Sequence, residues 1–475
     1  MNRIIVRGLL SAVCLCACVA GRLESAVVYV DLSATGSNNG TSWQNAFTDL
    51  NAAIAASGMD DQIWVAAGTY LPHPTDRTVS FAMKSSVNTY GGFNGSETLV
   101  SERNPSANLT ILSGDISTTG VSTDNSYHVV TTANFVTLDG FTITGGYADG
   151  ASPNDGGAGL LAAGLGSFNC VNLSFTNNVA SGNGGAIRLS DSDVDLTLTN
   201  CRFDNNEASD GGAIYHSAGD MTGLNLSFSG NIALNNGGAI ALGGAVAFSV
   251  ENALFYDNDA NASTGRGGAI YNASSGSVAI VNATVSDNGA NRGGGVFNAG
   301  AALSLINCVF WSNDSTQPTG ASIDSASGNP AVRYSVIEFG LSGSDVAGAV
   351  AGFKIYDGDP LFVSISGRDF RLTAGSSCID RADGNAAPVS DIEGALRHDD
   401  AGRPNDGSGI LKTCDIGAYE FQGESRRAEA VGLFSDDSCA LTHRRATPPN
   451  ASFIAFAFIA LIGLKMTFTY RRLFC

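Results

Sequence analysis

A short motif repeats through the middle of the sequence and limits how the chain can fold. Asn-x-x-Phe-x-x-Asn occurs at 172–178, 200–206, 225–231, 252–258 and 307–313, and the copy at 282–288 has Val285 in place of Phe. A second motif, Gly-Gly-Ala-Ile, starts at Gly184, Gly211, Gly237 and Gly267, with variants at Gly156 and Gly293. The copies lie 25 to 30 residues apart, a period typical of solenoid proteins.

Apolar and polar residues alternate on both sides of the first Asn of each copy. The positions four and two before it, and one and three after it, are apolar in every copy except at Gly223. A period of two is that of a half-buried strand, but the phase slips by one residue at the Asn. The chain therefore turns a corner there, and Asn suits such a corner because it tolerates the left-handed backbone conformation.

One such turn cannot bury its apolar face alone, so we expect identical turns to stack about 4.8 Å apart. This predicts an all-β fold, a parallel β-helix, and the crossover rule favours the right-handed form. Stacked amides should form a ladder at the corner, and stacked rings should fill the core. The predicted corner ladder is Asn172, Asn200, Asn225, Asn252, Asn282 and Asn307, and the predicted core stack is Phe175, Phe203, Phe228, Phe255 and Phe310.

The regular repeats cover about 156–320 of a predicted β-helix domain at 27–421. The helical spacing of Phe47, Leu50, Ile54 and Ala55 predicts an N-terminal helix that caps the solenoid. Less regular early turns are expected at 63–70, 79–93, 109–116 and 129–143, and closing turns at 332–339 and 370–372.

The two ends of the chain carry targeting signals. Arg3 and Arg7 precede an apolar run at 8–20, which predicts a signal peptide at 1–26. Cys18 stands in a poor lipidation motif. Residues 422–450 are polar and are interpreted as a linker, and 451–475 as a C-terminal hydrophobic tail helix that anchors or sorts the protein. The cell envelope or a membrane would be its partner, and the alternative is a buried terminal helix.

The formal net charge of −19 argues against nucleic-acid binding, which needs a basic surface. A monomer is expected. Cys378 and Cys414 lie outside the repeats and could form a disulfide in an oxidising compartment, with two free thiols as the alternative. Cys201 and Cys308 occupy one column four turns apart, too far for a disulfide, and should pack as small apolar residues.

The paired GGAI and FxxN repeats resemble those of chlamydial polymorphic outer-membrane proteins, which are surface adhesins of the type V secretion class. The flanking segments YVDLSATGSNNGTSWQNAF from Tyr29, YGGFNGSET from Tyr90, LDGFTITGG from Leu138 and DIGAYEF from Asp415 resemble exported bacterial β-helix proteins of the choice-of-anchor kind. The resemblance implies an exported protein that is at the cell surface, in the outer membrane or extracellular. Residues 422–475 are too few for the membrane barrel of the adhesins, so self-transport is not expected.

Two functions are compatible with these features. The repeat loops hold few titratable groups, which favours a non-catalytic scaffold that presents a binding or adhesive surface. The alternative is a carbohydrate-active enzyme, a polysaccharide lyase or glycoside hydrolase, with its site in the irregular turns near Asp115, Asp124 and His128. Three or more acids and an Arg that converge in one groove would favour the enzyme.

Two sets of residues are candidates for ligand binding. Arg266 and Arg292 precede Gly-Gly in neighbouring turns and could bind an anionic glycan from a host or cell surface, or point into water. No cofactor is expected except Ca²⁺, which prefers oxygen ligands. The Ca²⁺ candidates are Asp357 and Asp359, and an acid-rich stretch contains Asp380, Asp383, Asp391, Glu393, Asp399, Asp400 and Asp406. Ordinary polar loops are the alternative explanation of these acids.

Overall fold

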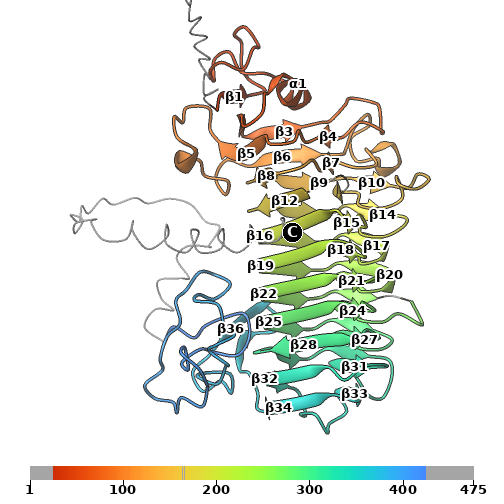
Figure 1. Ribbon diagram of the computed structural model, residues 1–475, viewed down its shortest axis with the longest axis vertical. Helices are drawn as coiled ribbons and strands as arrows, with labels where there is room; N and C mark the ends of the chain where they lie inside the picture. Colours follow the sequence, from red (N-terminus) through yellow and green to blue (C-terminus); the bar gives the residue numbers. More distant parts are fainter. Residues whose placement is uncertain (1–24, 163, 165, 261, 424–475) are drawn as a thin grey trace, which may run out of the picture. The chain divides into compact units, whose positions relative to one another are not determined.

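The structure is a computed structural model that describes residues 25–162, 164, 166–260 and 262–423. Its strands pair in parallel from one turn to the next, so that successive turns stack as layers (Figure 1). The turns build sheets of 17, 10 and 7 strands, and a separate sheet has two strands. The predicted parallel β-helix is therefore confirmed. Its right-handed sense remains a prediction.

The 17-stranded sheet carries the corner Asn residues. Long strands such as β16 run through the corner, whereas other turns place separate strands on its two sides. Its strands are β1 Val27–Val30, β2 Gln62–Ala66, β3 Gly68–Tyr70, β5 Asn88–Phe93, β6 Thr110–Ser113, β8 Val136–Asp139, β9 Thr142–Thr144, β12 Gly166–Val171, β13 Ser174–Thr176, β16 Val194–Asp204, β19 Asp220–Ser229, β22 Ala247–Tyr256, β25 Ser277–Ser286, β28 Ala302–Ile306, β29 Val309–Trp311, β32 Ala331–Ile337 and β34 Ala351–Tyr356.

The two smaller parallel sheets complete each turn. The ten-stranded sheet follows the Gly-Gly corner and comprises β4 Phe81–Ala82, β7 Val130–Thr131, β11 Leu160–Ala162, β15 Ile187–Leu189, β18 Ile214–His216, β21 Ile240–Leu242, β24 Ile270–Asn272, β27 Val296–Asn298, β31 Ile323–Ser325 and β33 Val346–Gly348. The seven-stranded sheet comprises β10 Tyr147–Ala148, β14 Val179–Ala180, β17 Glu207–Asp210, β20 Ile232–Asn236, β23 Asp259–Ala260, β26 Gly289–Ala290 and β30 Asp314–Ser315.

The register places equivalent residues of successive copies opposite each other. Phe175 pairs with Phe203, Phe203 with Phe228, and Phe228 with Phe255. Their ring centroids are 5.1, 4.7 and 4.7 Å apart and the rings are nearly parallel. Val285 continues the column to Phe310, and all of these side chains are buried. The motif therefore supplies one continuous apolar core.

A short helix, α1 (Leu50–Ala56), precedes the early turns and lies against β1 and β4. The Asp49 side chain accepts a hydrogen bond from the Ala52 N–H and begins the helix. Leu50, Ala53 and Ile54 are its buried residues, which agrees with the helical spacing in the sequence. Its role as a cap of the solenoid remains a prediction. Two 3₁₀ turns, η1 (Val100–Glu102) and η2 (Ser122–Asp124), lie in early loops.

The parallel strands end with β34, and residues 357–423 form what we call the C-terminal segment. It contains the antiparallel pair β35 (Phe362–Ser364) and β36 (Asp369–Leu372). The prediction that 370–372 closes the solenoid is therefore wrong, because β36 pairs with β35 instead of with a turn. A second apolar cluster joins this segment to Val309 and Val336 of the solenoid.

The signal peptide, Cys18 and the tail helix predicted at 451–475 lie outside the described residues, as does nearly all of the linker at 422–450. Among the described residues, no helix is long and apolar enough to cross a membrane.

Candidate functional site

The six Asn residues of the predicted corner ladder all have left-handed backbones, with φ between 50° and 56°. The amide of Asn200 donates to Oδ1 of Asn172 at 3.1 Å. The next two steps, from Asn225 to Asn200 and from Asn252 to Asn225, are 2.9 Å each. Asn307 donates to Asn282 at 3.0 Å. The amides therefore bond along the solenoid axis, as stacked amides do in cross-β structures, but the predicted ladder is interrupted between Asn252 and Asn282, because the amide of Asn282 donates to the C-terminal segment instead.

Residues of the C-terminal segment form further hydrogen bonds with the side-chain amides of the last three members of this ladder, Asn252, Asn282 and Asn307. Asn252 donates to the carbonyl of Ser390 at 2.9 Å, and Asn282 donates to the carbonyls of Asp415 and Gly417 at 3.1 Å each. Asn307 donates to the carbonyl of Asp383 at 3.1 Å and accepts from its N–H at 2.7 Å. Asn252, Asn282 and Asn307 are buried, whereas Asn172 and Asn200 are exposed.

A second ladder lies inside the solenoid and was missed in the sequence interpretation. It is formed by the last Asn of each motif copy, which is Asn178, Asn206, Asn231, Asn258, Asn288 and Asn313. Each side-chain amide donates to Oδ1 of the next member at 2.8 to 3.1 Å. The signal was present, because this Asn recurs as regularly as the first, but only the first was assigned to a ladder.

Arg266 and Arg292 occupy neighbouring turns of one column, as predicted. Both guanidinium groups lie over the ring of Phe297, at 5.1 and 4.9 Å from its centroid. Arg292 also makes two hydrogen bonds, of 2.7 and 2.8 Å, to the carboxylate of Asp324. In the described part of the chain Arg266 has no carboxylate partner. The two cations are therefore not equivalent, since Asp324 already neutralises one of them.

The two Ca²⁺ candidates have different surroundings. Asp359 accepts a hydrogen bond from the Leu361 N–H at 2.8 Å and lines a groove that is described below, whereas Asp357 does not line it. No three His, Cys, Asp or Glu side chains within the described ranges are arranged to hold a metal ion. A Ca²⁺ site at Asp357 and Asp359 would therefore lack a surrounding cluster of carboxylates.

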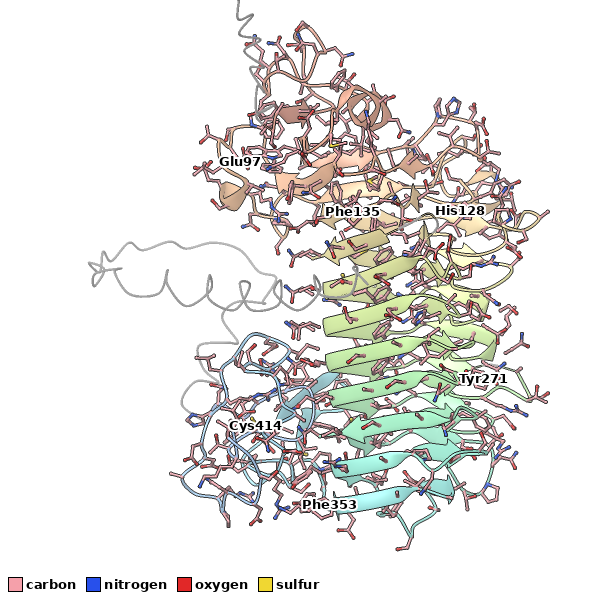
Figure 2. The ribbon with its side chains drawn as sticks, viewed as in Figure 1. Glu97, His128, Phe135, Tyr271, Phe353 and Cys414 are labelled. Carbon is pink, nitrogen blue, oxygen red and sulfur yellow. The ribbon has the colours of Figure 1, made fainter. Side chains whose placement is uncertain are left out.

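The predicted disulfide is not formed. Cys378 and Cys414 are free, fully buried thiols in the same apolar cluster of the C-terminal segment, where Figure 2 labels Cys414. Burial raises the pKa of both thiols to about 12. Because the thiolate starts disulfide exchange, these thiols are poorly reactive. Cys201 and Cys308 are free and buried, as expected of small apolar residues.

The enzyme site suggested near Asp115, Asp124 and His128 does not form a common hydrogen-bond network. Both acids accept hydrogen bonds from N–H groups of the loop that carries them. The ring of His128 bonds instead to the carbonyl of Gly157 at 3.0 Å and to Asn154 at 3.2 Å. Burial lowers the pKa of His128. These residues serve the structure of the early loops.

A groove elsewhere does bring acids and an arginine together. We call it the Trp311 groove. It has a volume of about 700 Å³, and its lining residues are Asp287, Trp311, Asp359, Leu361, Phe362, Ser364, Ile365, Ser366 and Arg368. One wall comes from the solenoid, at the ends of β25 and β29. The other comes from the β35–β36 hairpin of the C-terminal segment. The sequence interpretation identified only Asp359 among these residues.

Arg368 joins the two walls of the groove. Its guanidinium forms ion pairs with Asp257 and Asp287, which occupy the same left-handed corner position in neighbouring turns. Burial raises the pKa of Asp257, although Arg368 opposes this change. Two acids, Asp287 and Asp359, and one arginine therefore line the groove, which is one acid fewer than the arrangement set out above for the enzyme hypothesis. Arg368 is paired with Asp287 in the lining and with Asp257 outside it.

The stacked turns define the described chain as a parallel β-helix protein. Its repeats match the Chlamydia polymorphic membrane protein repeat over residues 172–190, 200–217 and 225–247. No curated protein matches the chain.

Two solved structures are similar to this chain at low sequence identity. The structure of pectate lyase Pel9A shares 16% identity, with 83% of this chain and 96% of that chain covered and a TM-score of 0.44. The pectin methylesterase from Aspergillus niger, in deglycosylated form, shares 14% identity, with coverages of 74% and 90% and a TM-score of 0.28. Similarity at this level carries no argument about activity.

Proposed function

We propose that the protein is exported to the cell surface or outer membrane, where its β-helix acts as a non-catalytic binding or adhesive scaffold. The observation that carries this proposal is the match of three successive turns to a polymorphic membrane protein repeat. Those turns belong to a solenoid whose side chains form continuous columns along its length. Such a scaffold offers a long surface on which side chains recur from turn to turn.

The outward column of the ten-stranded sheet supports a binding role. Tyr215 and Tyr271 point outward from β18 and β24, because the residues on either side of each are buried (Figure 2 labels Tyr271). Ala241 lies between them in the column. Tyr271 stacks on Phe297, and Arg266 lies over the ring of Phe297, so this flank combines aromatic and cationic groups, which are common in binding surfaces.

Protease treatment of intact cells that produce the full chain tests the surface location. The expected result is that added protease cleaves the chain while a cytoplasmic control protein stays intact. Protection of the chain in intact cells, with cleavage only after lysis, would contradict the proposed location. An antibody against the solenoid, applied to unpermeabilised cells, gives an independent readout of the same property.

The second candidate is a carbohydrate-active enzyme, and the Trp311 groove is the observation that favours it. Asp287 and Asp359 supply carboxylates to its lining, and glycoside hydrolysis requires a pair of them. The ion pairs of Arg368 oppose this function, because they hold Asp257 and Asp287 as charged partners of a cation. The purified full chain should therefore leave acidic and neutral polysaccharides intact, with or without Ca²⁺. New chain ends in any of these incubations would overturn the non-catalytic proposal.

A further inference from the structure

The two walls of the Trp311 groove are fixed to each other by side-chain packing and ion pairs. Phe370 of β36 is buried and packs against Tyr256 of the solenoid, with ring centroids 5.4 Å apart. Phe362 of β35 packs edge-to-face on Phe370, also at 5.4 Å. Together with the two ion pairs of Arg368, these contacts fix the hairpin against the solenoid corner. The groove walls are therefore held in place before any ligand arrives.

Trp311 differs from the other two tryptophans of the chain. Trp43 and Trp64 each pack against the rings of Tyr29 and Phe93. Trp311 is half-buried in the groove lining, and no aromatic ring within the described residues packs against it. Its strand partner one turn earlier is Ser286, a small residue. The indole packs against the second apolar cluster, and the part of it that stays exposed lines the groove, where a ligand can contact it.

The charges in the groove determine which ligands it can accept. The carboxylates of Asp287 and Asp359 line the groove, and the one cation of the lining, Arg368, is already paired with Asp287 and with Asp257 outside the lining. An anionic glycan would meet net repulsion. Oδ1 of Asp359 accepts the Leu361 N–H, while Oδ2 has no hydrogen bond from a described residue. Ser364 and Ser366 add hydroxyl groups. Hydroxyl-rich, uncharged ligands suit such a lining.

We infer that the Trp311 groove binds an uncharged saccharide, with a sugar ring against the indole of Trp311 and sugar hydroxyls bonded to Asp359 and Ser364. A volume of about 700 Å³ lies within the range of small-molecule sites and has room for more than one sugar unit. The inference rests on the proposed function, because it names the ligand class of the scaffold. It locates binding at the junction of solenoid and hairpin, away from Arg266 and Arg292.

The test is calorimetric titration of the purified full chain with uncharged gluco-, manno-, galacto- and xylo-oligosaccharides. Polygalacturonate serves as the anionic comparison. The expected result is binding of at least one uncharged oligosaccharide and none of polygalacturonate. Trp311→Ala should weaken that binding by about tenfold or more, as for the loss of a central aromatic contact. Trp311→Phe should recover most of it, because it keeps an aromatic face.

Two controls separate loss of the ligand contact from loss of the fold. Phe135→Ala removes an exposed aromatic ring from the early turns, outside the groove, and should leave binding unchanged. The thermal melting of Trp311→Phe should match that of the unaltered chain. The inference would be overturned if Trp311→Ala bound the oligosaccharide as tightly as the unaltered chain. It would also be overturned if the unaltered chain bound only polygalacturonate, or bound no uncharged oligosaccharide.

Failure of the inference can be told apart from failure of the proposed function. A chain that protease reaches on intact cells but that binds no uncharged oligosaccharide refutes only the saccharide groove. A chain that binds such an oligosaccharide through Trp311 but is protected in intact cells refutes only the surface location. New chain ends during the titration would instead show that the groove is catalytic.

Discussion

The two Asn residues of each motif copy have different structural roles, although both form hydrogen-bonded ladders. The first Asn turns the corner with a left-handed backbone, and in the early turns it is exposed. The last Asn is buried inside the solenoid. Asn206, for example, donates to the carbonyl of Phe175 and to Asn231, and accepts from Asn178. A buried polar group that loses its partner costs far more than an exposed one.

Asn206→Ala should therefore destabilise the protein much more than Asn200→Gly. The alanine removes the bond to the Phe175 carbonyl and leaves the main-chain N–H of Asn178 and one N–H of its side-chain amide without their acceptor, at a cost of at least about 3 kcal/mol. The glycine keeps the left-handed corner and loses only exposed bonds, at a cost of about 1 kcal/mol or less. Urea unfolding of both variants measures the difference, and equal costs would contradict the distinct roles.

Asp380 should make stability depend on pH. It is fully buried, neither of its carboxylate oxygens has a partner among the described residues, and burial raises its pKa to about 7. The folded protein then holds a proton that the unfolded chain has released, so stability falls as pH rises from about 4 through about 7. Asp380→Asn should raise the melting temperature by a few degrees at pH 8 and change it little near pH 4. An equal effect at both values would contradict this account.

At the scale of elements, a buried ion pair stabilises the C-terminal segment where the segment contacts the corner ladder. Arg397 and Glu420 lie 2.8 Å apart with side chains only 3% and 0% exposed. Arg397 also donates to the carbonyls of Pro388 and Ser390 and to Asn252 at 3.4 Å. This arginine therefore joins the DIGAYEF motif, a neighbouring loop and the solenoid.

Arg397→Met should release the C-terminal segment while the solenoid stays folded. It leaves the Glu420 carboxylate buried without its cation, at a cost of about 3–5 kcal/mol. Hydrogen exchange should then become faster at 378–421, with little change at 172–313. The double variant with Glu420→Gln should recover part of the loss, because it removes the unpaired charge. Uniform acceleration along the whole chain would show that the segment is not a separate unit.

The repeated elements could be predicted from the sequence because each column of stacked residues recurs at the same position in several motif copies. Phe203, Phe228 and Phe255 align at a fixed spacing, and stacking follows from the period alone. The Trp311 groove could not be predicted in this way. Arg368 comes from a hairpin that follows the last turn, and nothing in the spacing indicates that it reaches back to Asp257 and Asp287. Such a contact depends on how an irregular segment folds over the repeats.

At the scale of the whole molecule, the solenoid and the C-terminal segment create the candidate site only together. The repeats supply Asp287 and Trp311, and the hairpin supplies Arg368 and the opposite wall. A variant that detaches the segment should therefore lose saccharide binding even with Trp311 in place. Arg397→Met tests this link, because it lies outside the groove lining and acts through the attachment of the segment. Hydrogen exchange must first show that the C-terminal segment is released in this variant. If the released variant still binds the oligosaccharide with unchanged affinity, the groove is not built from both parts.

The most direct test of the account uses intact cells that produce the full chain, either unaltered or with Trp311→Ala. The cells are mixed with beads that carry the uncharged oligosaccharide bound best in solution, and both retained beads and new reducing ends are measured. The account predicts that the unaltered chain retains beads, that Trp311→Ala does not, and that neither releases reducing ends. Equal retention by both chains, or release of reducing ends by the unaltered chain, would contradict a surface scaffold that binds without catalysis.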